Sequence, residues 1–453
     1  MGNGRATAIG AALAACVSLG ACESYAPGEL ARGPNLAVSP ERLTVDLSKL
    51  PPVPLKAHKF DPSDGLDPTE VAILAVLNNP DLIAKRAAAK VAGAQVFSAG
   101  LLPDPQVALS ADFPDHPAGL VTAYGITPTI DLLSLITRSA ALRAARSSEK
   151  QADLDLLWSE WSTAQQARQL AVTALGDEAK GAVLRTIDDG LTARYRQSSL
   201  AYQRHDITAQ VNSVDLAAKL DADAQLAIAL HDSLKARGDL NAIIGLAPAV
   251  KLNLTAGAPP VDPLDAALDR AIASLPERRP DLLALKAGHE AQNANLRKAI
   301  LSQFPLINLG FSRQRDTGAV LTNGVAATLV IPIFNRGRGA IAIQAATRER
   351  LAQEYQARLD QTIADVATAR RDLAADRVNL GRLESEVPRL VSMTDAANAA
   401  YLRGDLDSAA SLALEQSALK QQVAVLDLRL AVELADISLE TVLFLPSDEG
   451  GQP

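Results

Sequence analysis

The chain has 453 residues, of which 48% are hydrophobic but only 3% aromatic, and its formal net charge at pH 7 is −8. The negative charge argues against a nucleic acid as partner. Alanine supplies much of the apolar content, which favours helices and gives side chains too small for a thick globular core. Small side chains instead allow long helices to pack closely.

The first 21 residues predict the signal peptide of a bacterial lipoprotein. Arg5 is followed by an apolar run from Ala8 to Leu19, which is too short to span a membrane. The run leads into Leu19-Gly20-Ala21-Cys22, which resembles a lipobox. The resemblance implies cleavage before Cys22 and acylation of that cysteine, and Glu23 after it favours the outer membrane. An ordinary signal peptide cut near the same place is the alternative.

The next segments predict a tether and two helices. Residues 22–65 are rich in Pro, Ser and Gly without clear periodicity, which predicts an extended N-terminal tether. Asp67, followed by Pro68 and Glu70, has the pattern of a capping box at a helix start. A second helix follows Asn79-Pro80-Asp81 and ends before Pro103-Asp104-Pro105.

A predicted β-hairpin and two long helices complete this first unit, which spans residues 66–247. Within 105–132, apolar and polar residues alternate in two segments, as they do in strands. No proline occurs from Arg138 to Ala247. We therefore expect two antiparallel helices over 138–247, with leucine and alanine at coiled-coil spacing and a reversal near Tyr202 to Asp206.

The same order of elements then recurs, which indicates an internal duplication. Residues 248–263 contain four prolines and predict a crossover linker. The second unit, residues 264–445, repeats Pro80-Asp81-Leu82 as Pro280-Asp281-Leu282 and predicts a hairpin over 305–335 and a helix pair over 338–443. Residues 446–453 predict a disordered tail.

A strand passes almost directly into a very long helix between Leu329 and Gly339. Pro332 cannot donate a hydrogen bond to a neighbouring strand, so it suits the place where strand pairing ends. Asn335 and Gly337 allow the chain to turn there. In the alternation predicted for this strand, Val325, Ala327, Leu329, Ile331 and Ile333 share one face. The corresponding junction of the first unit contains Pro128 and Asp131. Few soluble folds need such a junction, whereas a barrel that continues into a helical tube does.

These features resemble the TolC-type outer-membrane efflux factor family over roughly Asp67 to Leu445. The specific parts are the Arg279-Pro280-Asp281-Leu282 helix start, the junction from Ile331 to Gly337 and the Tyr401-x-x-Gly404 turn. The lipobox resembles that of the lipoprotein branch. The resemblance implies a mainly α fold with a membrane β-barrel: duplicated helix-hairpin-helix-helix units form a trimeric barrel and a long α-helical periplasmic tunnel.

The resemblance also implies the function and the partners. The protein would be the passive outer-membrane channel of a tripartite efflux pump and would export drugs, toxic compounds or metal ions. Its partners would be two further copies of itself, a periplasmic adaptor protein, a proton-driven inner-membrane pump and outer-membrane lipid. Two alternatives stay open: a type I secretion duct for polypeptides, and a structural coiled-coil envelope lipoprotein.

The resemblance implies different surroundings for the two faces of the predicted strands. The apolar residues would face lipid: Val107, Leu109, Phe113, Tyr124, Ile126, Ile307, Leu309, Phe311, Leu329 and Ile331. The polar residues would face the channel: Gln106, Ser110, Asp112, Thr127, Asn308, Ser312 and Thr328. A soluble hairpin with one buried face is the alternative.

The two helix turns are the expected docking tips for the adaptor. The residues concerned are Tyr202, Arg204, His205 and Asp206 in the first unit, and Tyr401, Arg403, Gly404 and Asp405 in the second. Gly404 tolerates the positive φ of a helix-reversing turn, and His205 takes its place in the first unit, so we expect the tips to differ. Solvated loops with capping aspartates are the alternative.

A closing mechanism cannot be transferred from the family. Some members close the tunnel with aspartates on the helix after the second tip, where this chain has Ala410 and Ala413. Asp407, Ser411 and Glu415 are the nearby polar residues and hence the candidate gate residues.

The sequence offers no pattern for catalysis. Its five histidines lack the spacing of metal ligands, and neither a phosphate-binding loop nor a nucleophile elbow is present. Of the two cysteines, Cys16 would leave with the signal peptide and Cys22 would carry lipid. We therefore expect no enzyme activity, no cofactor, no metal site and no disulfide.

Overall fold

The structure is a computed structural model that describes residues 25–53, 55, 58–115, 118–257, 265–330 and 332–445. The predicted signal peptide, Cys22 and the predicted tail 446–453 lie outside the described residues. The chain divides into two compact units, Met1–Leu36 and Ala37–Pro453. In the first unit, the described residues 25–36 form neither helix nor strand and are exposed.

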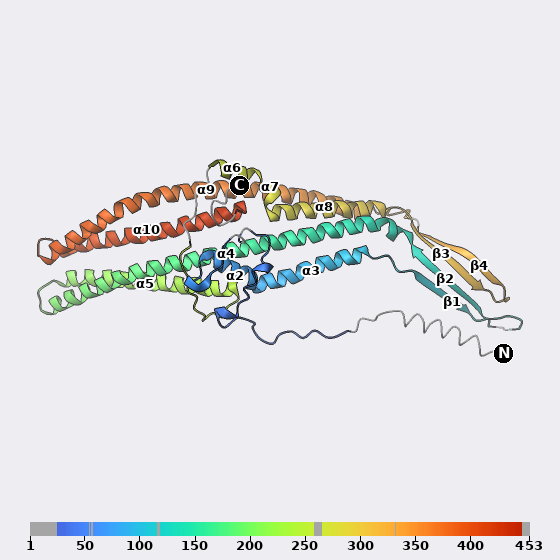
Figure 1. The fold of residues 1–453 in the computed structure, drawn as a ribbon, viewed down its shortest axis with the longest axis horizontal. Helices are drawn as coiled ribbons and strands as arrows, with labels where there is room; N and C mark the ends of the chain where they lie inside the picture. The colour runs from blue at the N-terminus through green and yellow to red at the C-terminus, as the bar shows by residue number, and fades with distance from the viewer. Residues whose placement is uncertain are drawn as a thin grey trace. The chain divides into compact units, whose positions relative to one another are not determined.

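Helices and strands of the second unit follow one another in the same order twice (Figure 1). The first series consists of α2 (Pro68–Asn78), α3 (Pro80–Gly100), β1 (Gln106–Asp112), β2 (Ala123–Asp131), α4 (Leu132–Gln203) and α5 (Ala209–Ile244). The second consists of α6 (Asp265–Ala273), α7 (Leu275–Arg278), α8 (Pro280–Leu301), β3 (Leu306–Arg315), β4 (Leu321–Val330), α9 (Arg338–Leu402) and α10 (Ser408–Leu443).

Local sequence signals set the helix ends. The Asp67 side chain accepts hydrogen bonds from the amides of Thr69 and Glu70, and the Glu70 carboxylate accepts one from the Asp67 amide, so the expected capping box is present. At the other end of the first series, Gly245 has a φ of 82° and ends α5. Of the described helices, none combines the length and the apolar character needed to cross a membrane.

Helix α4 starts earlier than the sequence suggested. It has 72 residues and begins at Leu132 rather than near Arg138, because the Asp131 carboxylate accepts hydrogen bonds from the amides of Leu133 and Ser134. Gly176 lies inside the helix, and a β-carbon there would stand 3.1 Å from the Leu430 side chain. This glycine therefore allows α4 and α10 to approach closely.

Part of the predicted tether is packed into the helical body. The described residues of the segment contain short 3-10 helices: η1 (Pro40–Arg42), η2 (Leu47–Lys49) and η4 (Pro62–Asp64). The side chains of Leu50, Val53 and Leu55 are buried in a cluster with Trp161 of α4 and residues of α2. The prediction of an extended tether over 22–65 is therefore wrong from Ala37 onward. In this part, apolar side chains at irregular spacing pack into the core.

The four strands form one antiparallel sheet in the order β1-β2-β3-β4. In Figure 1 this sheet lies at one end of the second unit, and the α4–α5 and α9–α10 turns lie at the other. In each series, the end of the last helix contacts the start of an early helix. Asn79 donates a side-chain hydrogen bond to the Ile243 carbonyl near the end of α5, and Arg279 donates one to the Val442 carbonyl near the end of α10.

The crossover between the series is partly described. Residues 248–257 contain no helix, and Leu254 forms an isolated parallel bridge with Leu66. The remainder of the predicted linker, 258–263, lies outside the described residues.

Candidate functional site

The two helix turns share one backbone design. In the first, the Asp206 amide donates to the Ala201 carbonyl at 2.9 Å and the His205 amide donates to the Tyr202 carbonyl at 3.0 Å. In the second, the Asp405 amide donates to the Ala400 carbonyl and the Gly404 amide to the Tyr401 carbonyl, both at 2.9 Å. This pair of bonds is the Schellman motif, which ends a helix and reverses the chain.

The central residue of both turns has a positive φ. The value is 63° for His205 and 82° for Gly404. The two turns therefore have the same backbone, because His205 adopts the conformation that glycine prefers. The turns do differ in strain, since a non-glycine residue in this region carries a steric cost.

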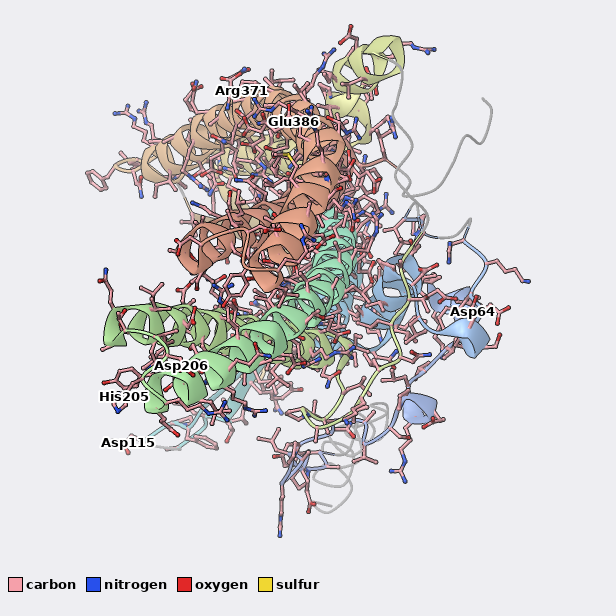
Figure 2. All side chains as sticks on the ribbon, turned by 90° about the vertical axis from the view of Figure 1, so that its left-hand side faces the viewer. Asp64, Asp115, His205, Asp206, Arg371 and Glu386 are labelled. Atoms are coloured by element: carbon pink, nitrogen blue, oxygen red, sulfur yellow. The ribbon has the colours of Figure 1, made fainter. Side chains whose placement is uncertain are left out.

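Charged and aromatic side chains surround these turns. Figure 2 looks onto this end of the unit and shows His205 and Asp206 at the tip of the α4–α5 hairpin. In the second turn, Arg403 pairs with Asp405 at 3.0 Å, and both side chains are exposed. Exposed pairs of this kind contribute little to stability, so the tips present charge to solvent rather than holding the fold together.

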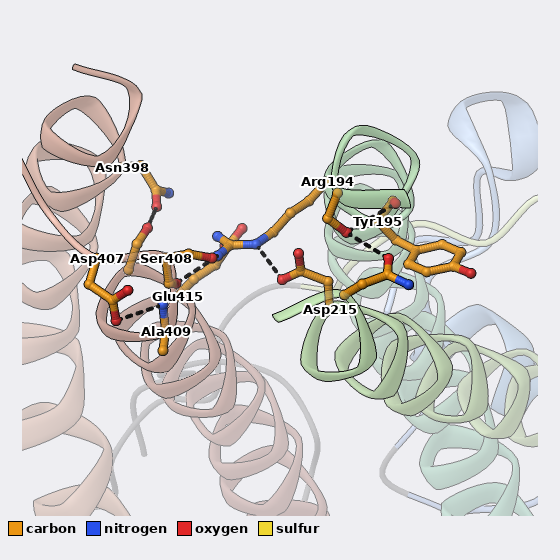
Figure 3. A network of polar contacts seen from close by, with 11 residues as sticks. Arg194, Tyr195, Asp215, Asn398, Asp407, Ser408, Ala409 and Glu415 are labelled. Carbon is orange, nitrogen blue, oxygen red and sulfur yellow. Dashed lines mark hydrogen bonds and ion pairs between the residues drawn. The ribbon is translucent and has the colours of Figure 1, made fainter. Parts of the chain in front are cut away.

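Arg194 of α4 joins the four long helices just below the tips (Figure 3). Its Nε donates to Asp215 of α5 at 2.9 Å, and its Nη2 donates to the carbonyl and hydroxyl oxygens of Ser408 of α10 at 2.7 and 2.9 Å. Its guanidinium carbon lies 5.1 Å from the ring centre of Tyr401 of α9. One half-buried cation thus contacts each of the other three long helices.

The three candidate gate residues have separate roles. Asp407 caps α10, since its carboxylate accepts from the Ala409 amide at 3.2 Å. Ser411 is fully buried and its hydroxyl donates to the Asn398 side chain at 2.6 Å. Only Glu415 joins the Arg194 cluster, with its Oε2 3.6 Å from Arg194 Nη1. Burial raises the pKa of Glu415, Arg194 lowers it and Asp215 raises it further.

Sequence reasoning missed Arg194, Asp215 and Ser408. One signal was available for the first two, because Arg194 and Asp215 stand at similar distances on either side of the turn and therefore face each other across an antiparallel hairpin. No local signal pointed to Ser408, because its contact joins the two series across the core of the unit.

The junctions between strands and helices differ in the two series. In the first, Pro128 lies inside β2, opposite Val107, and pairing continues to Asp131, which caps α4. In the second, β4 ends at Val330 and Pro332 lies beyond the strand. Ile333 is exposed and lies outside β4, so the prediction that it belongs to the strand alternation is wrong. The Arg338 amide donates to the Asn335 carbonyl, and Gly337, with a φ of 67°, precedes α9.

The strand register separates apolar from polar side chains. Leu109 faces Ile126, Ile130 faces Leu309, and Ile307 faces Leu329, so these residues share one side of the sheet. Ser110, Thr127, Asn308, Ser312 and Thr328 share the other side by the same pairing. The apolar side is exposed to its surroundings, with Leu109 67% and Phe311 53% exposed. A large apolar surface of this kind marks a contact with lipid or protein.

The comparisons with known proteins concern the structure. No family model and no curated protein sequence matches the chain. The CmeC outer membrane channel of Campylobacter jejuni is 15% identical, with a TM-score of 0.72 over 84% of this chain and 87% of that one. The MtrE outer membrane channel of Neisseria gonorrhoeae, in its open state, is 16% identical, with a TM-score of 0.69 over 85% and 90%. The chain has the fold of these outer-membrane channels.

A third structure extends the likeness. VceC, an outer membrane protein of Vibrio cholerae, is 17% identical, with a TM-score of 0.68 over 84% of this chain and 97% of that one. The likeness to these structures therefore extends over more than four fifths of this chain. Within the described residues, no group of three or more His, Cys, Asp or Glu side chains is arranged to hold a metal ion.

Proposed function

We propose that the protein is the outer-membrane channel of a tripartite efflux pump, a passive trimeric duct that exports small molecules such as drugs, toxic compounds or metal ions. One observation carries the proposal: a sheet with one apolar and one polar side continues into very long helices. In a duct of this fold, the apolar side faces lipid, the polar side lines the channel, and the helices extend the channel through the periplasm.

Glycines on one side of the sheet support this assignment of its faces. Gly125, Gly310 and Gly324 all lie on the polar side. A β-carbon on Gly125 would stand 2.6 Å from Ser110 Oγ, and one on Gly310 would stand 2.3 Å from the Pro128 carbonyl oxygen. Side chains converge on the inner side of a curved sheet, so this crowding fits a barrel whose polar side faces inward.

The free edges and an exposed helix face support a trimer. The sheet ends in β1 and β4, whose outer edges have no partner strand among the described residues. Unpaired edges are not tolerated in lipid, and three copies would close a barrel of about twelve strands. On α5, Leu220, Ala224, Ala227 and Leu234 are exposed at the spacing of a coiled-coil seam. This seam suits contact with a neighbouring copy.

The tips and the N-terminus complete the proposal. Tyr202, Arg204, His205 and Asp206, with Tyr401, Arg403, Gly404 and Asp405, would dock onto a periplasmic adaptor bound to a proton-driven inner-membrane pump. Acylated Cys22 would anchor the protein in the outer membrane. Of the candidate gate residues, Glu415 has the strongest structural support, because Asp407 and Ser411 already serve the helix end and the core.

A deletion strain tests this function. Loss of the gene should raise sensitivity to small toxic compounds, and the purified protein should be an outer-membrane trimer that crosslinks to its adaptor through a cysteine at position 405. Loss of polypeptide secretion with unchanged sensitivity would instead support a type I secretion duct. A monomer that leaves the membrane fraction when Cys22 is replaced by Ser would contradict both and support a structural envelope lipoprotein held by its lipid alone.

A further inference from the structure

Two arginines lie on the apolar side of the sheet. In the pairing of β2 with β3, Arg313 faces Ile126 and Arg315 faces Tyr124. In the pairing of β3 with β4, Arg313 faces Asn323 and Arg315 faces Leu321. Directly paired residues share a face, so both arginines stand on the same side as Leu309 and Phe311.

Neither guanidinium is neutralised by the described part of the chain. No ion pair or side-chain hydrogen bond joins Arg313 or Arg315 to another described residue. The strand positions on this side contain no aspartate or glutamate, because Asp112 and Asp131 lie on the other side. Asp316, in the following turn, accepts a hydrogen bond from the Val320 amide through its carboxylate. Two adjacent positive charges are therefore left beside an apolar surface.

Their height on the sheet suits a membrane surface. At about 3.3 Å per residue and a strand tilt of about 40°, Arg313 and Arg315 stand roughly 15 and 20 Å above the level of Ile307, towards the end of β3 remote from the long helices. The apolar band of a membrane barrel is about 25 Å tall. The two residues thus lie near the far edge of this band, and their long side chains can extend the guanidinium charge into the headgroup layer.

We propose that Arg313 and Arg315 form a binding site for the phosphate groups of anionic lipid headgroups, in the leaflet around the turn end of the sheet. The planar guanidinium donates two parallel hydrogen bonds to phosphate oxygens, which lysine cannot match. The inference rests on the proposed membrane channel and adds that the bilayer's headgroup charge stabilises the protein at this end.

The test compares bilayers of different charge. Full-length protein is placed in nanodiscs of phosphatidylcholine alone or of phosphatidylcholine with phosphatidylglycerol, and the melting temperature and the retained lipid (by native mass spectrometry) are measured. The wild type should melt at a higher temperature in the anionic bilayer and retain anionic lipid. Arg313→Gln with Arg315→Gln should lose at least about half of both effects, because two point charges are removed.

A matched control removes two charges elsewhere. Arg185→Gln with Arg196→Gln neutralises two exposed arginines of α4 and should leave both lipid effects as in the wild type. Inorganic phosphate added to the neutral bilayer should not reproduce the rise in melting temperature, which separates a headgroup from a free anion. An equal rise in melting temperature and equal lipid retention in the wild type and the Arg313/Arg315 variant would overturn this inference but not the proposed channel. Failure of the wild type to enter either bilayer would overturn it together with the proposed channel.

Discussion

His205 and Gly404 occupy the same position in two Schellman turns, and both have a positive φ, of 63° and 82° respectively. The two tips therefore have the same backbone with different intrinsic strain. In Gly404 the conformation costs almost nothing, and no other heavy atom lies within 4 Å of where a β-carbon would stand. A substitution there acts through the backbone alone.

Gly404→Val should loosen the second tip without affecting the membrane part. Strain of about 1–3 kcal/mol is expected for a β-branched residue at this φ. Hydrogen exchange of the Asp405 amide should accelerate, while the outer-membrane trimer should form in normal amounts but lose adaptor crosslinking and efflux. His205→Val should have a smaller effect, because histidine already bears part of the strain, and His205→Gly should slow exchange at Asp206. Full crosslinking and efflux in Gly404→Val would exclude the second tip as the docking site.

Arg194→Gln should destabilise the region below the tips in a pH-dependent way. Removing Arg194 leaves the buried Asp215 and the half-buried Glu415 without their cation, at a cost of about 3 kcal/mol. It also removes the group that lowers the Glu415 pKa, so that pKa should rise further above its ordinary value. A carboxyl group whose pKa is raised in the folded state loses its contribution to stability as the pH rises from the unfolded value through the folded one.

The difference between wild type and Arg194→Gln should therefore be smaller at pH 5 than at pH 8. Chemical denaturation at both pH values measures it. Arg403→Gln is the matched control, since Arg403 pairs with an exposed carboxylate and should show little loss at either pH. A difference that is the same at both pH values would show that Glu415 and Asp215 are not stabilised by Arg194.

Adjacent residues of β3 test the two sides of the sheet. Leu309→Arg should cost about 2–4 kcal/mol if Leu309 meets lipid near the middle of the membrane. Asn308→Arg should cost much less, because Asn308 faces Asp131 on the polar side. Trimer stability in detergent measures both, and an equal or larger loss for Asn308→Arg would reverse the assignment of the faces.

The packed N-terminal segment predicts a contrast between two leucines. Leu50 is 5% exposed within a core cluster, whereas Leu30 is 91% exposed. Leu50→Ala should lower the free energy of unfolding by about 2–4 kcal/mol, through lost burial and the cavity it leaves. Leu30→Ala should change it by less than about 0.5 kcal/mol. Similar values for both would mean that the segment does not pack as described.

Cys22→Ser tests the lipid anchor. The Leu19-Gly20-Ala21-Cys22 motif predicts that the variant loses labelling by a fatty-acid probe. Membrane association should persist, because a closed barrel satisfies its own backbone hydrogen bonds in lipid. Undiminished labelling would show that Cys22 is not acylated.

Elements with a regular period could be predicted from the sequence. The capping box at Asp67 and the alternation through Leu309 and Leu329 agree with the structure, because each depends on neighbouring residues. The packing of Leu50 and the Arg194 cluster depend on contacts between distant segments. The φ of His205 was missed for another reason: hydrogen bonds to Ala201 and Tyr202 impose the turn against the preference of the side chain.

An internal proline distinguishes one of the two long helices that lead to the tips from the other. Pro388 lies inside α9, where it removes the hydrogen bond to the Glu384 carbonyl, whereas α4 has no proline. Pro388 stands about 20 Å from Leu402 along the helix axis. A change of about 20° in the bend at Pro388 would sweep the second tip sideways by roughly 7 Å. Helix α4 is then the stiffer of the two helices, and α9 can bend at Pro388. The contact of Arg194 with Tyr401 links the two helices close to the tips.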